Sequence, residues 1–463
     1  MKYFSTRGSV KDISFQDAVM MGLAEDGGLL LPASVPLFSL RDLKHFSELK
    51  YDKLCCQIMR HFISDIPESE LAQIIAASYS TGNFDTPEII PVVKAGGVKI
   101  AELFHGPTFA FKDMALQFLG NLFEYILKKQ NKKMNIIGAT SGDTGSAAIY
   151  GVRGKENINI FILYPTGRIS PVQEQQMASV QDDNVFCISA AGSFDDCQNT
   201  VKALFNDLDF KSQYNLGAVN SINWARILAQ IIYYFHIYFK STKHIGDTIN
   251  VVVPTGNFGN IFAGYMARKM GLPIKLLLAT NKNNILTRAV KFGDYSIERV
   301  RPSHSPSMDI QIASNFERYL YYLYGESTEK TIDAMENLRS EKEIEFRGQY
   351  LGQLQRDFIA ADANDEEIEA AIRKVYDKSD YIIDPHTACA VHAAYKMELA
   401  GEDTVCLATA HPAKFSEVIE ETLGFKPQEP EAISALKDMP MRSNKMDADP
   451  YDVKKFIISS LQG

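Results

Sequence analysis

A short apolar run opens into a glycine-containing turn at Val251-Val252-Val253-Pro254-Thr255-Gly256-Asn257-Phe258-Gly259-Asn260. The run predicts a strand, and the apolar spacing that follows the turn predicts a helix. A helix start leaves backbone N–H groups without partners inside the helix, and the helix dipole adds positive charge there. The turn can therefore hold a phosphate without a cationic side chain, although an ordinary tight turn explains the same residues. The spacing matches neither GxGxxG nor GxxxxGK, which argues against a dinucleotide or a P-loop nucleotide.

The same alternation of strand and helix continues on both sides of this turn. It is typical of βαβ units around a mostly parallel sheet, which places the strand-to-helix loops along one edge, where α/β proteins bind ligands. The predicted strands are Asn135–Ala139, Ile158–Tyr164, Val185–Ser189, Ile249–Val253, Ile274–Ala279 and Thr404–Ala408. The predicted helices between them are Met114–Leu127, Ser146–Gly151, Phe194–Leu208, Trp224–Phe239 and Ile261–Met270.

The chain of 463 residues is too long for one compact core, since domains commonly run to about 100–200 residues. We predict a helical amino-terminal region over 1–92 and a smaller α/β domain over 93–215. A larger α/β domain is predicted over 216–463, with a helical insertion at about 282–378. Within it, residues 427–450 carry four prolines and few apolar residues, and we expect a tail that lies on the surface before a short final helix.

Composition excludes several classes of function. The net charge of −9 argues against nonspecific binding of nucleic acid or anionic lipid. No apolar stretch approaches the roughly 18 residues of a membrane span, and the first residues lack a signal-peptide core. The six cysteines show neither a paired framework nor CxxC spacing, and the nine histidines show no HExxH spacing. We therefore expect a cytoplasmic protein with reduced thiols and no metal site.

Two further loops carry chemistry. The first is Ala139-Thr140-Ser141-Gly142-Asp143-Thr144-Gly145-Ser146, which follows a predicted strand and can bind a carboxylate or a ring hydroxyl, or can simply cap a helix. The second is His105-Gly106-Pro107-Thr108-Phe109-Ala110-Phe111-Lys112-Asp113, just before an apolar-periodic helix. Partial desolvation and the helix dipole are expected to lower the pKa of the Lys112 amine, and a neutral amine can attack an aldehyde. The alternative is a solvated lysine at a helix start.

Together these three segments resemble threonine synthase, a member of the fold type II pyridoxal-phosphate enzymes, and specifically its longer bacterial and fungal class. The resemblance runs in order through STRG at 5–8, DGGL at 26–29, HGPTFAFKD at 105–113, SGDTG at 141–145, NSINWAR at 220–226, PTGNFGN at 254–260, PSMDI at 306–310 and ATAHPAKF at 408–415. It implies an α/β fold similar to the tryptophan synthase β subunit, with two open, mostly parallel sheets flanked by helices and a helical amino-terminal region.

The resemblance also implies roles for individual residues. Lys112 is the Schiff-base lysine, and Thr409 meets the pyridine nitrogen of pyridoxal 5'-phosphate. Asp143 stands where relatives often carry asparagine, so its carboxylate needs a neutralising partner. The backbone amides that hold the cofactor phosphate are those of Gly256, Asn257, Phe258, Gly259 and Asn260. The substrate carboxylate lies by Ser141, Gly142 and Thr144, and the substrate phosphate by Ser221, Asn223 and Arg226.

The implied reaction converts O-phospho-L-homoserine and water into L-threonine and phosphate, the last step of threonine biosynthesis. It is a carbon–oxygen lyase reaction acting on a phosphate, by γ-elimination and β-hydration, with Lys112 as anchor and acid/base. Two alternatives stay open: a phospholyase that releases a keto acid, and a protein that keeps the fold without turnover. No segment resembles the activator-binding extension of the plant enzymes, so we expect a monomer whose partner is a small molecule, with no nucleic acid and no membrane.

Overall fold

The computed structural model describes residues 1–462 and divides into two compact units. Unit 1 comprises Met1–Gly106 and Ser221–Pro427, and unit 2 comprises Pro107–Asn220 and the segment from Gln428 onward. This contact-based division groups the last segment with unit 2, whereas the boundaries predicted from the sequence place it with residues 216–427. The three-part division from the sequence therefore stays a prediction.

Unit 2 is built on a parallel sheet with the strand order β15-β7-β6-β5-β8. Strands β5, β6 and β7 lie where the alternation of strand and helix predicted them. The strands are β5 (Met134–Ala139), β6 (Ile158–Pro165), β7 (Val185–Ala191), β8 (Leu216–Gly217) and β15 (Asn444–Asp447). The helices are α5 (Lys112–Gln130), α6 (Asp143–Val152), α7 (Pro171–Ala178), α8 (Phe194–Asn206), α9 (Leu208–Gln213), α19 (Glu431–Ser434) and α20 (Pro450–Gln462), with the short 3-10 helix η3 (Ala435–Asp438).

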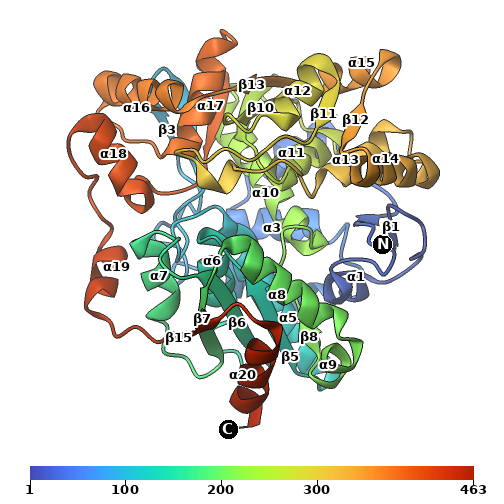
Figure 1. Ribbon diagram of the computed structural model, residues 1–463. Coiled ribbons are helices and arrows are strands. Elements are labelled where there is room, and N and C mark those ends of the chain that lie inside the picture. Colours follow the sequence, from blue (N-terminus) through green and yellow to red (C-terminus); the bar gives the residue numbers. More distant parts are fainter. Residues whose placement is uncertain (463) are drawn as a thin grey trace. The chain divides into compact units, whose positions relative to one another are not determined.

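The carboxy-terminal segment completes this sheet, which differs from the predicted surface tail. Asn444 pairs with Ile188, so β15 runs parallel to β7 as an edge strand (Figure 1, dark red). The strand reads Asn-Lys-Met-Asp and has no buried position, so it lacks the apolar pattern that reveals a core strand. The following helix α20 buries Val453 and Ile457 against the core under β5, β6 and β7. The prediction of a short final helix is therefore confirmed.

Unit 1 contains a sheet with the strand order β13-β10-β9-β14-β4-β3, parallel except for the edge strand β3. Its central strands are continuous apolar runs, as expected for strands buried on both faces. The strands are β3 (Val92–Ala95), β4 (Val98–Glu102), β9 (Ile249–Pro254), β10 (Ile274–Thr280), β13 (Phe358–Asp362) and β14 (Thr404–Ala408). Two antiparallel ribbons lie outside it, β1 (Tyr3–Ser5) with β2 (Leu30–Pro32) and β11 (Asp294–Ser296) with β12 (Glu343–Glu345).

The helices of unit 1 include four amino-terminal ones, within the region 1–92 that was predicted to be helical. Those before the sheet are α1 (Phe15–Met21), α2 (Leu40–Ser47), α3 (Tyr51–Met59) and α4 (Glu68–Ser78). Those between and after the strands are α10 (Trp224–Ser241), α11 (Gly259–Lys269), α12 (Ile285–Phe292), α13 (Phe316–Leu323), α14 (Thr328–Ser340), α15 (Gly348–Asp357), α16 (Asp365–Ser379), α17 (Pro385–Lys396) and α18 (Ser416–Leu423), with the 3-10 helices η1 (Pro306–Met308) and η2 (Pro412–Phe415).

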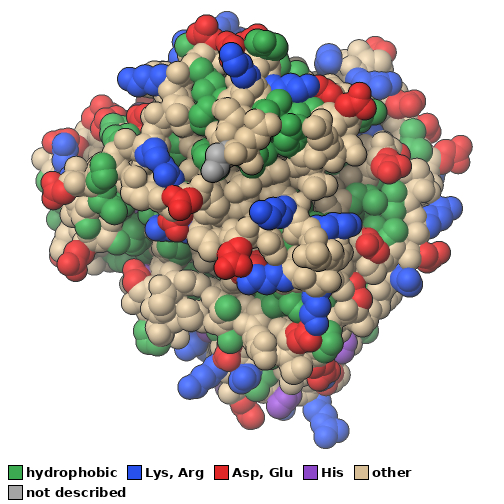
Figure 2. All heavy atoms as spheres, turned by 90° about the horizontal axis from the view of Figure 1, so that it is seen from below, with side chains coloured by type: hydrophobic (Ala, Val, Ile, Leu, Met, Phe, Trp, Pro, Cys, Tyr) green, Lys and Arg blue, Asp and Glu red, His purple; other side chains and the backbone are tan. Residues whose placement is uncertain are grey.

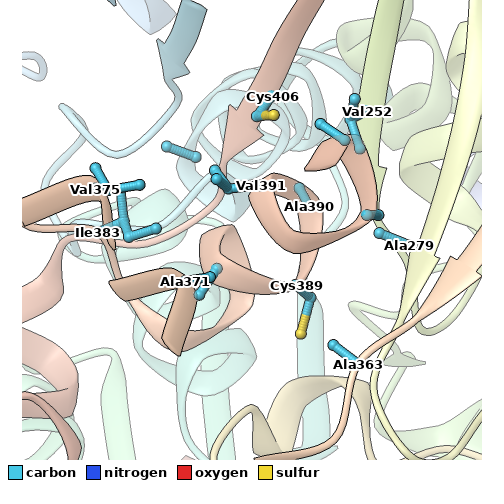
Figure 3. Packing of buried hydrophobic residues seen from close by; sticks show 14 of the residues in the cluster. Val252, Ala279, Ala363, Ala371, Val375, Ile383, Cys389, Ala390, Val391 and Cys406 are labelled. Atoms are coloured by element: carbon cyan, nitrogen blue, oxygen red, sulfur yellow. The ribbon is translucent and has the colours of Figure 1, made fainter. Parts of the chain in front are cut away.

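Small side chains let helix α17 lie close to the sheet of unit 1. Cys389, Ala390 and Val391 on this helix are fully buried, and they belong to one cluster with Val252 of β9 and Cys406 of β14 (Figure 3). Close packing of this kind leaves little freedom for the strands beneath the helix. The carboxyl ends of β9 and β14, where the candidate site begins, are therefore held by a rigid core.

The α/β class with two open, mostly parallel sheets is confirmed. Within residues 1–462, no helix combines the length and apolarity needed to cross a membrane. The same residues contain no group of three or more histidine, cysteine or acidic side chains arranged to hold a metal. On the face shown in Figure 2, basic and acidic side chains are interspersed.

Candidate active site

The turn between β9 and α11 in unit 1 presents backbone amides at a helix start. Phe258 precedes the helix in the left-handed conformation, with φ 63°, and no side chain caps the helix at this position. Its ring is buried and packs against Phe316, with ring centroids 5.0 Å apart, and against Phe358, at 5.5 Å. The first amides of a helix lack intrahelical partners, so this anchored turn aims free donors at one point.

Gly256 lies against the PSMDI segment, for which the sequence suggested no role. A Cβ atom at 256 would stand 3.1 Å from the Ser307 carbonyl oxygen and 3.2 Å from the Met308 Cα. The segment itself is fixed by the Asp309 carboxylate, which accepts hydrogen bonds from Ser303 Oγ (2.6 Å) and Asn281 Nδ2 (2.8 Å). Burial raises the pKa of Asp309. Residues 306–310 therefore pack so closely against Gly256 that a larger side chain there would need its neighbours to shift by a few tenths of an ångström.

Asn260 offers a further donor beside these amides. Its Oδ1 accepts hydrogen bonds from the hydroxyls of Tyr233 (2.6 Å) and Tyr234 (2.8 Å) on α10. Its Nδ2 is buried and has no hydrogen-bond partner within the described residues 1–462. An unsatisfied buried donor costs about 1–3 kcal/mol. A ligand oxygen at this turn would satisfy it.

Arg226, in the first turn of α10, is a buried cation with unused donors. Its side chain is 3% exposed, and neither Nε nor Nη1 has a hydrogen-bond partner among residues 1–462. Burial lowers the pKa of this guanidinium to about 10, so it stays charged at neutral pH. A buried charge is costly unless it is paired, and its planar fork matches a phosphate or a carboxylate. The geometry therefore fits an anionic ligand.

Asn223 and Ser221 have structural contacts of their own. Asn223 Oδ1 accepts the Ala225 amide (3.0 Å) and caps α10, while Nδ2 donates to the Val19 carbonyl (2.8 Å) of α1. The Ser221 carbonyl accepts from Asn315 Nδ2 (3.3 Å). Both polar atoms of the Asn223 carboxamide thus have structural partners, and the second N–H of Nδ2 is the donor that could still reach a substrate. The assignment of Ser221 and Asn223 to the substrate phosphate stays a prediction.

Lys112 begins helix α5 in unit 2. Its side chain is 12% exposed, and its Nζ lies 3.4 Å from Asp143 Oδ2 and 5.4 Å from the centroid of the Phe111 ring. The preceding turn is fixed by Asp113, whose fully buried carboxylate accepts from the Thr108 amide (2.8 Å) and hydroxyl (2.7 Å). Sequence reasoning missed this role of Asp113. Its signal was an acidic residue in the first turn of a helix, which is a common cap.

The Asp143 carboxylate is neutralised inside unit 2. One oxygen faces Lys112, and the other accepts from Gln173 Nε2 at 2.9 Å. Gln173 lies on α7, and its contact with Asp143 leaves no trace in the local sequence pattern. The question raised by a carboxylate at 143, where relatives often carry asparagine, therefore has a structural answer.

Gly142 makes room for this contact. Its φ is 139°, and a Cβ atom there would stand 2.2 Å from Gln173 Oε1. The loop is closed by Thr140 Oγ1, which accepts from the amides of Gly142 (3.0 Å) and Gly145 (2.9 Å). Ser141 is exposed and Thr144 half-buried at the rim of the loop. This loop is therefore a rigid turn with one carboxylate at its centre.

Thr409 follows strand β14 directly and is 7% exposed. Two residues further on, His411 Nδ1 accepts the Ala413 amide (3.1 Å), and burial lowers the pKa of His411 to about 4. His411 is thus a neutral capping residue. The predicted site residues are divided between the units: 256–260, Ser221, Asn223, Arg226 and Thr409 lie in unit 1, and Lys112 and 141–144 in unit 2.

Comparisons with known proteins cover the whole chain. Three family models match: "Threonine synthase N terminus" over residues 2–79, "Pyridoxal-phosphate dependent enzyme" over 100–349, and "Threonine synthase, C-terminal" over 387–457. Threonine synthase from Saccharomyces cerevisiae is 45% identical, covering 94% of this chain and 93% of its own length. The crystal structure of pyridoxal-phosphate-bound threonine synthase from Brucella melitensis is similar with a TM-score of 0.96 and 39% identity, covering 100% of both chains.

The residues present fit that cofactor. Pyridoxal phosphate offers a phosphate and an aldehyde; the helix-start amides and the unpartnered Asn260 Nδ2 suit the former, and an amine such as that of Lys112 suits the latter. Neither loop carries the spacing of a nucleotide site. The fold type II architecture is that of the solved relatives. The chain belongs to the threonine synthase family of pyridoxal-phosphate-dependent enzymes.

Proposed function

We propose that the chain catalyses the threonine synthase reaction, which converts O-phospho-L-homoserine and water into L-threonine and phosphate. The observation that carries this proposal is the Arg226 guanidinium, which is buried with two donor nitrogens unsatisfied. Such a group fits a phosphate dianion, because a bidentate contact supplies both the charge and the directed hydrogen bonds. Identity of 45% to a threonine synthase over nearly the full length supports the same reaction.

Residues of three loops would hold the cofactor. The amides of Gly256, Asn257, Phe258, Gly259 and Asn260 would bind its phosphate, and Lys112 would hold it as a Schiff base. Thr409 would meet the pyridine nitrogen, where a neutral hydroxyl does not enforce ring protonation as an aspartate would. When bound, pyridoxal phosphate supplies an electron-withdrawing ring that stabilises negative charge next to the substrate's α carbon.

The substrate would be held at its two anionic ends. Arg226 would bind the phosphate, with Ser221 and Asn223 as neutral donors beside it. The amides and hydroxyls of Ser141, Gly142 and Thr144 would bind the carboxylate. Asp143 stands in the same loop, and its pairing with Lys112 and Gln173 keeps its negative charge from repelling that carboxylate.

The Lys112 amine would move the protons. It would take a proton from the α carbon, pass that proton on, and then, as a neutral amine again, take one from the β carbon, so that phosphate leaves from the γ carbon. A proton returned to the γ carbon makes the methyl group, and water adds its oxygen at the β carbon while the α carbon regains a proton. One amine held near the reacting carbons can serve these steps in turn, since general acid–base catalysis needs a group within hydrogen-bond reach.

The decisive assay measures three products from O-phospho-L-homoserine with the purified, cofactor-loaded enzyme. Equal amounts of phosphate and threonine are expected. Phosphate accompanied by α-ketobutyrate would assign a phospholyase instead, and no phosphate release would reject both reactions. Arg226→Met serves as the matched variant, because it removes the phosphate contact without touching Lys112.

We also propose that the protein is a cytoplasmic monomer. All six cysteines are free and five of them are buried, which supports a reducing compartment. The small-molecule substrate itself calls for no protein partner. Light scattering coupled to size-exclusion chromatography measures the mass directly, and a value near twice 51.8 kDa would replace the monomer by a dimer.

A further inference from the structure

Arg318, on helix α13 of unit 1, is fully buried and ties three separate segments together. Its Nε donates to the Leu30 carbonyl (3.1 Å), and its Nη2 donates to the Ile222 carbonyl (2.5 Å). Its Nη1 donates to Asn315 Oδ1 (2.5 Å). All three acceptors are neutral, and burial lowers the pKa of Arg318 to about 9. The guanidinium therefore acts as a planar fork with three directed donors rather than as one half of an ion pair.

Two of these contacts reach the loops assigned to phosphate groups. Ile222 lies between Ser221 and Asn223, in the loop that leads into α10 and Arg226. Asn315 donates through its backbone amide (3.0 Å) and its Nδ2 (3.1 Å) to the Asn257 carbonyl, in the turn before α11. The same Nδ2 also donates to the Ser221 carbonyl (3.3 Å). Arg318 and Asn315 thus bridge the cofactor-phosphate turn and the substrate-phosphate loop.

The third contact reaches the amino-terminal ribbon. Leu30 belongs to β2, which pairs with β1. Glu317, the neighbour of Arg318, accepts from Thr6 Oγ1 (2.6 Å) and makes a two-point contact with Arg7 (3.0 and 2.8 Å). These contacts account for the STRG motif at 5–8, to which no chemical role has been assigned. Helix α13 therefore rests on the ribbon through two consecutive side chains.

A simpler account is that Arg318 merely fills the core, since its guanidinium carbon lies 5.9 Å from the Trp224 ring. Packing alone, however, would be served by an apolar side chain without the cost of burying a charge. An apolar side chain would also leave three carbonyl groups without their donor. The directed contact to the Ile222 loop, and the contact through Asn315 to the Asn257 turn, are therefore the property that arginine adds at this position.

We propose that Arg318 is a positioning residue that sets the cofactor-phosphate turn and the substrate-phosphate loop relative to each other, with the amino-terminal ribbon as its third support. The inference rests on the proposed function, because that function makes both loops phosphate sites. It extends the active-site machinery to a residue that touches neither ligand.

The main test is Arg318→Lys, which keeps the charge but cannot reach three acceptors in one plane. The expected result is a loss of about tenfold in the affinity of the apoenzyme for pyridoxal phosphate, measured by fluorescence titration without turnover. The KM for O-phospho-L-homoserine should also rise by about tenfold, while kcat at saturation changes by less than about threefold. If the role of Arg318 were purely structural, the substitution would not weaken the binding of both ligands while leaving kcat nearly unchanged.

Arg268→Lys is the matched control. Arg268 is a partly buried arginine of the same unit, hydrogen-bonded to the Asp357 carbonyl (2.8 Å) and carboxylate, and it touches neither loop. It should lower the melting temperature and leave both ligand constants unchanged. Equal loss of stability in the two variants, with cofactor affinity and KM within about twofold of wild type, would overturn the proposal. A change confined to one ligand would also overturn it.

Asn315→Ala provides a second route if Arg318→Lys does not fold. It removes the side-chain bonds of Asn315 to Arg318 Nη1 and to the Asn257 and Ser221 carbonyls. The backbone bond from the Asn315 amide to the Asn257 carbonyl remains, and Arg318 keeps its bonds to Leu30 and Ile222. Weakened binding of both ligands supports the proposal, and unchanged binding of both refutes it. The titration with cofactor also separates this inference from the reaction: a wild-type enzyme that makes no threonine would reject the proposed function, whatever Arg318→Lys does to cofactor affinity.

Discussion

The two ligand-binding turns of this protein share one design and differ in charge. The turn at 255–260 in unit 1 and the turn at 140–145 in unit 2 both lead from a parallel strand into a helix whose N-cap residue makes no side-chain capping bond. The first is neutral, and its backbone is anchored by the buried Phe258 ring. The second carries the Asp143 carboxylate, and its backbone is anchored by the Thr140 hydroxyl.

This difference indicates which anion each turn can accept. A phosphate dianion needs unshared donors with no carboxylate nearby, and the neutral turn provides them. The charged turn requires a partner for Asp143, and the Lys112 amine lies 3.4 Å from that carboxylate. The reactive amine thus lies in the unit whose loop is acidic. Each of the following variants tests one part of this contrast.

Lys112→Ala should have the largest effect, because it removes the only amine assigned to the reaction. Threonine formation is expected to fall by more than about 1,000-fold, the upper part of the range for a catalytic acid–base group. The visible absorbance band of the lysine-bound cofactor should disappear while cofactor binding through the neutral turn persists. Equilibrium dialysis of pyridoxal phosphate measures that binding.

Retention of the visible band in Lys112→Ala would show that another amine holds the cofactor. Lys155→Ala is a suitable control within unit 2, since its amine contacts Asn121 and Glu124 and lies in no candidate loop. It should keep both the band and the activity.

Arg226→Met should separate the two phosphate groups. It is expected to lower kcat/KM for O-phospho-L-homoserine by about 100-fold, as for loss of a charged hydrogen-bonding group, and to leave cofactor affinity unchanged. A fall in both kcat/KM and cofactor affinity would mean that Arg226 also contributes to phosphate binding at the neutral turn, and that this turn does not hold phosphate with amides alone.

The same variant has a stability signature. Because burial lowers the pKa of Arg226 to about 10, the buried charge disfavours folding at pH values below about 10, and this penalty is relieved as the pH rises above that value. Arg226→Met should therefore melt at the same or a higher temperature than wild type at neutral pH. With pyridoxal phosphate already bound at the neutral turn, inorganic phosphate should raise the melting temperature of wild type and not that of the variant.

Gly142→Ala, in the charged turn, should reduce activity more than Gly256→Ala, in the neutral turn. A Cβ atom at 142 would stand 2.2 Å from Gln173 Oε1, on a backbone with φ 139°, whereas at 256 the nearest atoms are 3.1 Å away. We expect a loss of about 10- to 100-fold in kcat/KM for Gly142→Ala and about tenfold or less for Gly256→Ala. Steady-state assays of both variants test this order, and a reversed order would show that the neutral turn is the less tolerant.

Much of the fold was predictable from the sequence. The strands β5, β6, β7, β9, β10 and β14 are continuous apolar runs, as expected where a parallel sheet is buried on both faces. Strand β15 was missed, because an edge strand with polar side chains carries no periodic signal. The pairing of β15 with β7 depends on tertiary contact across more than two hundred residues of chain.

The candidate site was predictable to a similar degree. Lys112 and Arg226 stood out through their motifs, and the structure gives each the burial and contacts that suit the proposed role. The contact of Gln173 with Asp143 and the three hydrogen bonds of Arg318 could not be predicted, because they join segments that are distant in sequence. Asn223 was assigned to substrate from its motif, while its observed contacts cap a helix. Motifs identify reactive groups better than they identify the residues that position them.

Asp143→Asn should have the smallest effect and tests the contrast most directly. The amide oxygen can still accept from Gln173, so the loop should keep its shape, and kcat at the optimum is expected to change by less than about fivefold. The negative charge beside Lys112 is lost, however, and a neighbouring carboxylate favours the protonated amine. The acid limb of the kcat profile, which reports the enzyme–substrate complex where this amine is free, should therefore move to lower pH, by about one unit. Asp209→Asn, on an exposed helix of the same unit, should leave the profile unchanged. If the Asp143→Asn profile also stays in place, the carboxylate does not control the amine, and the two turns differ in shape rather than in charge.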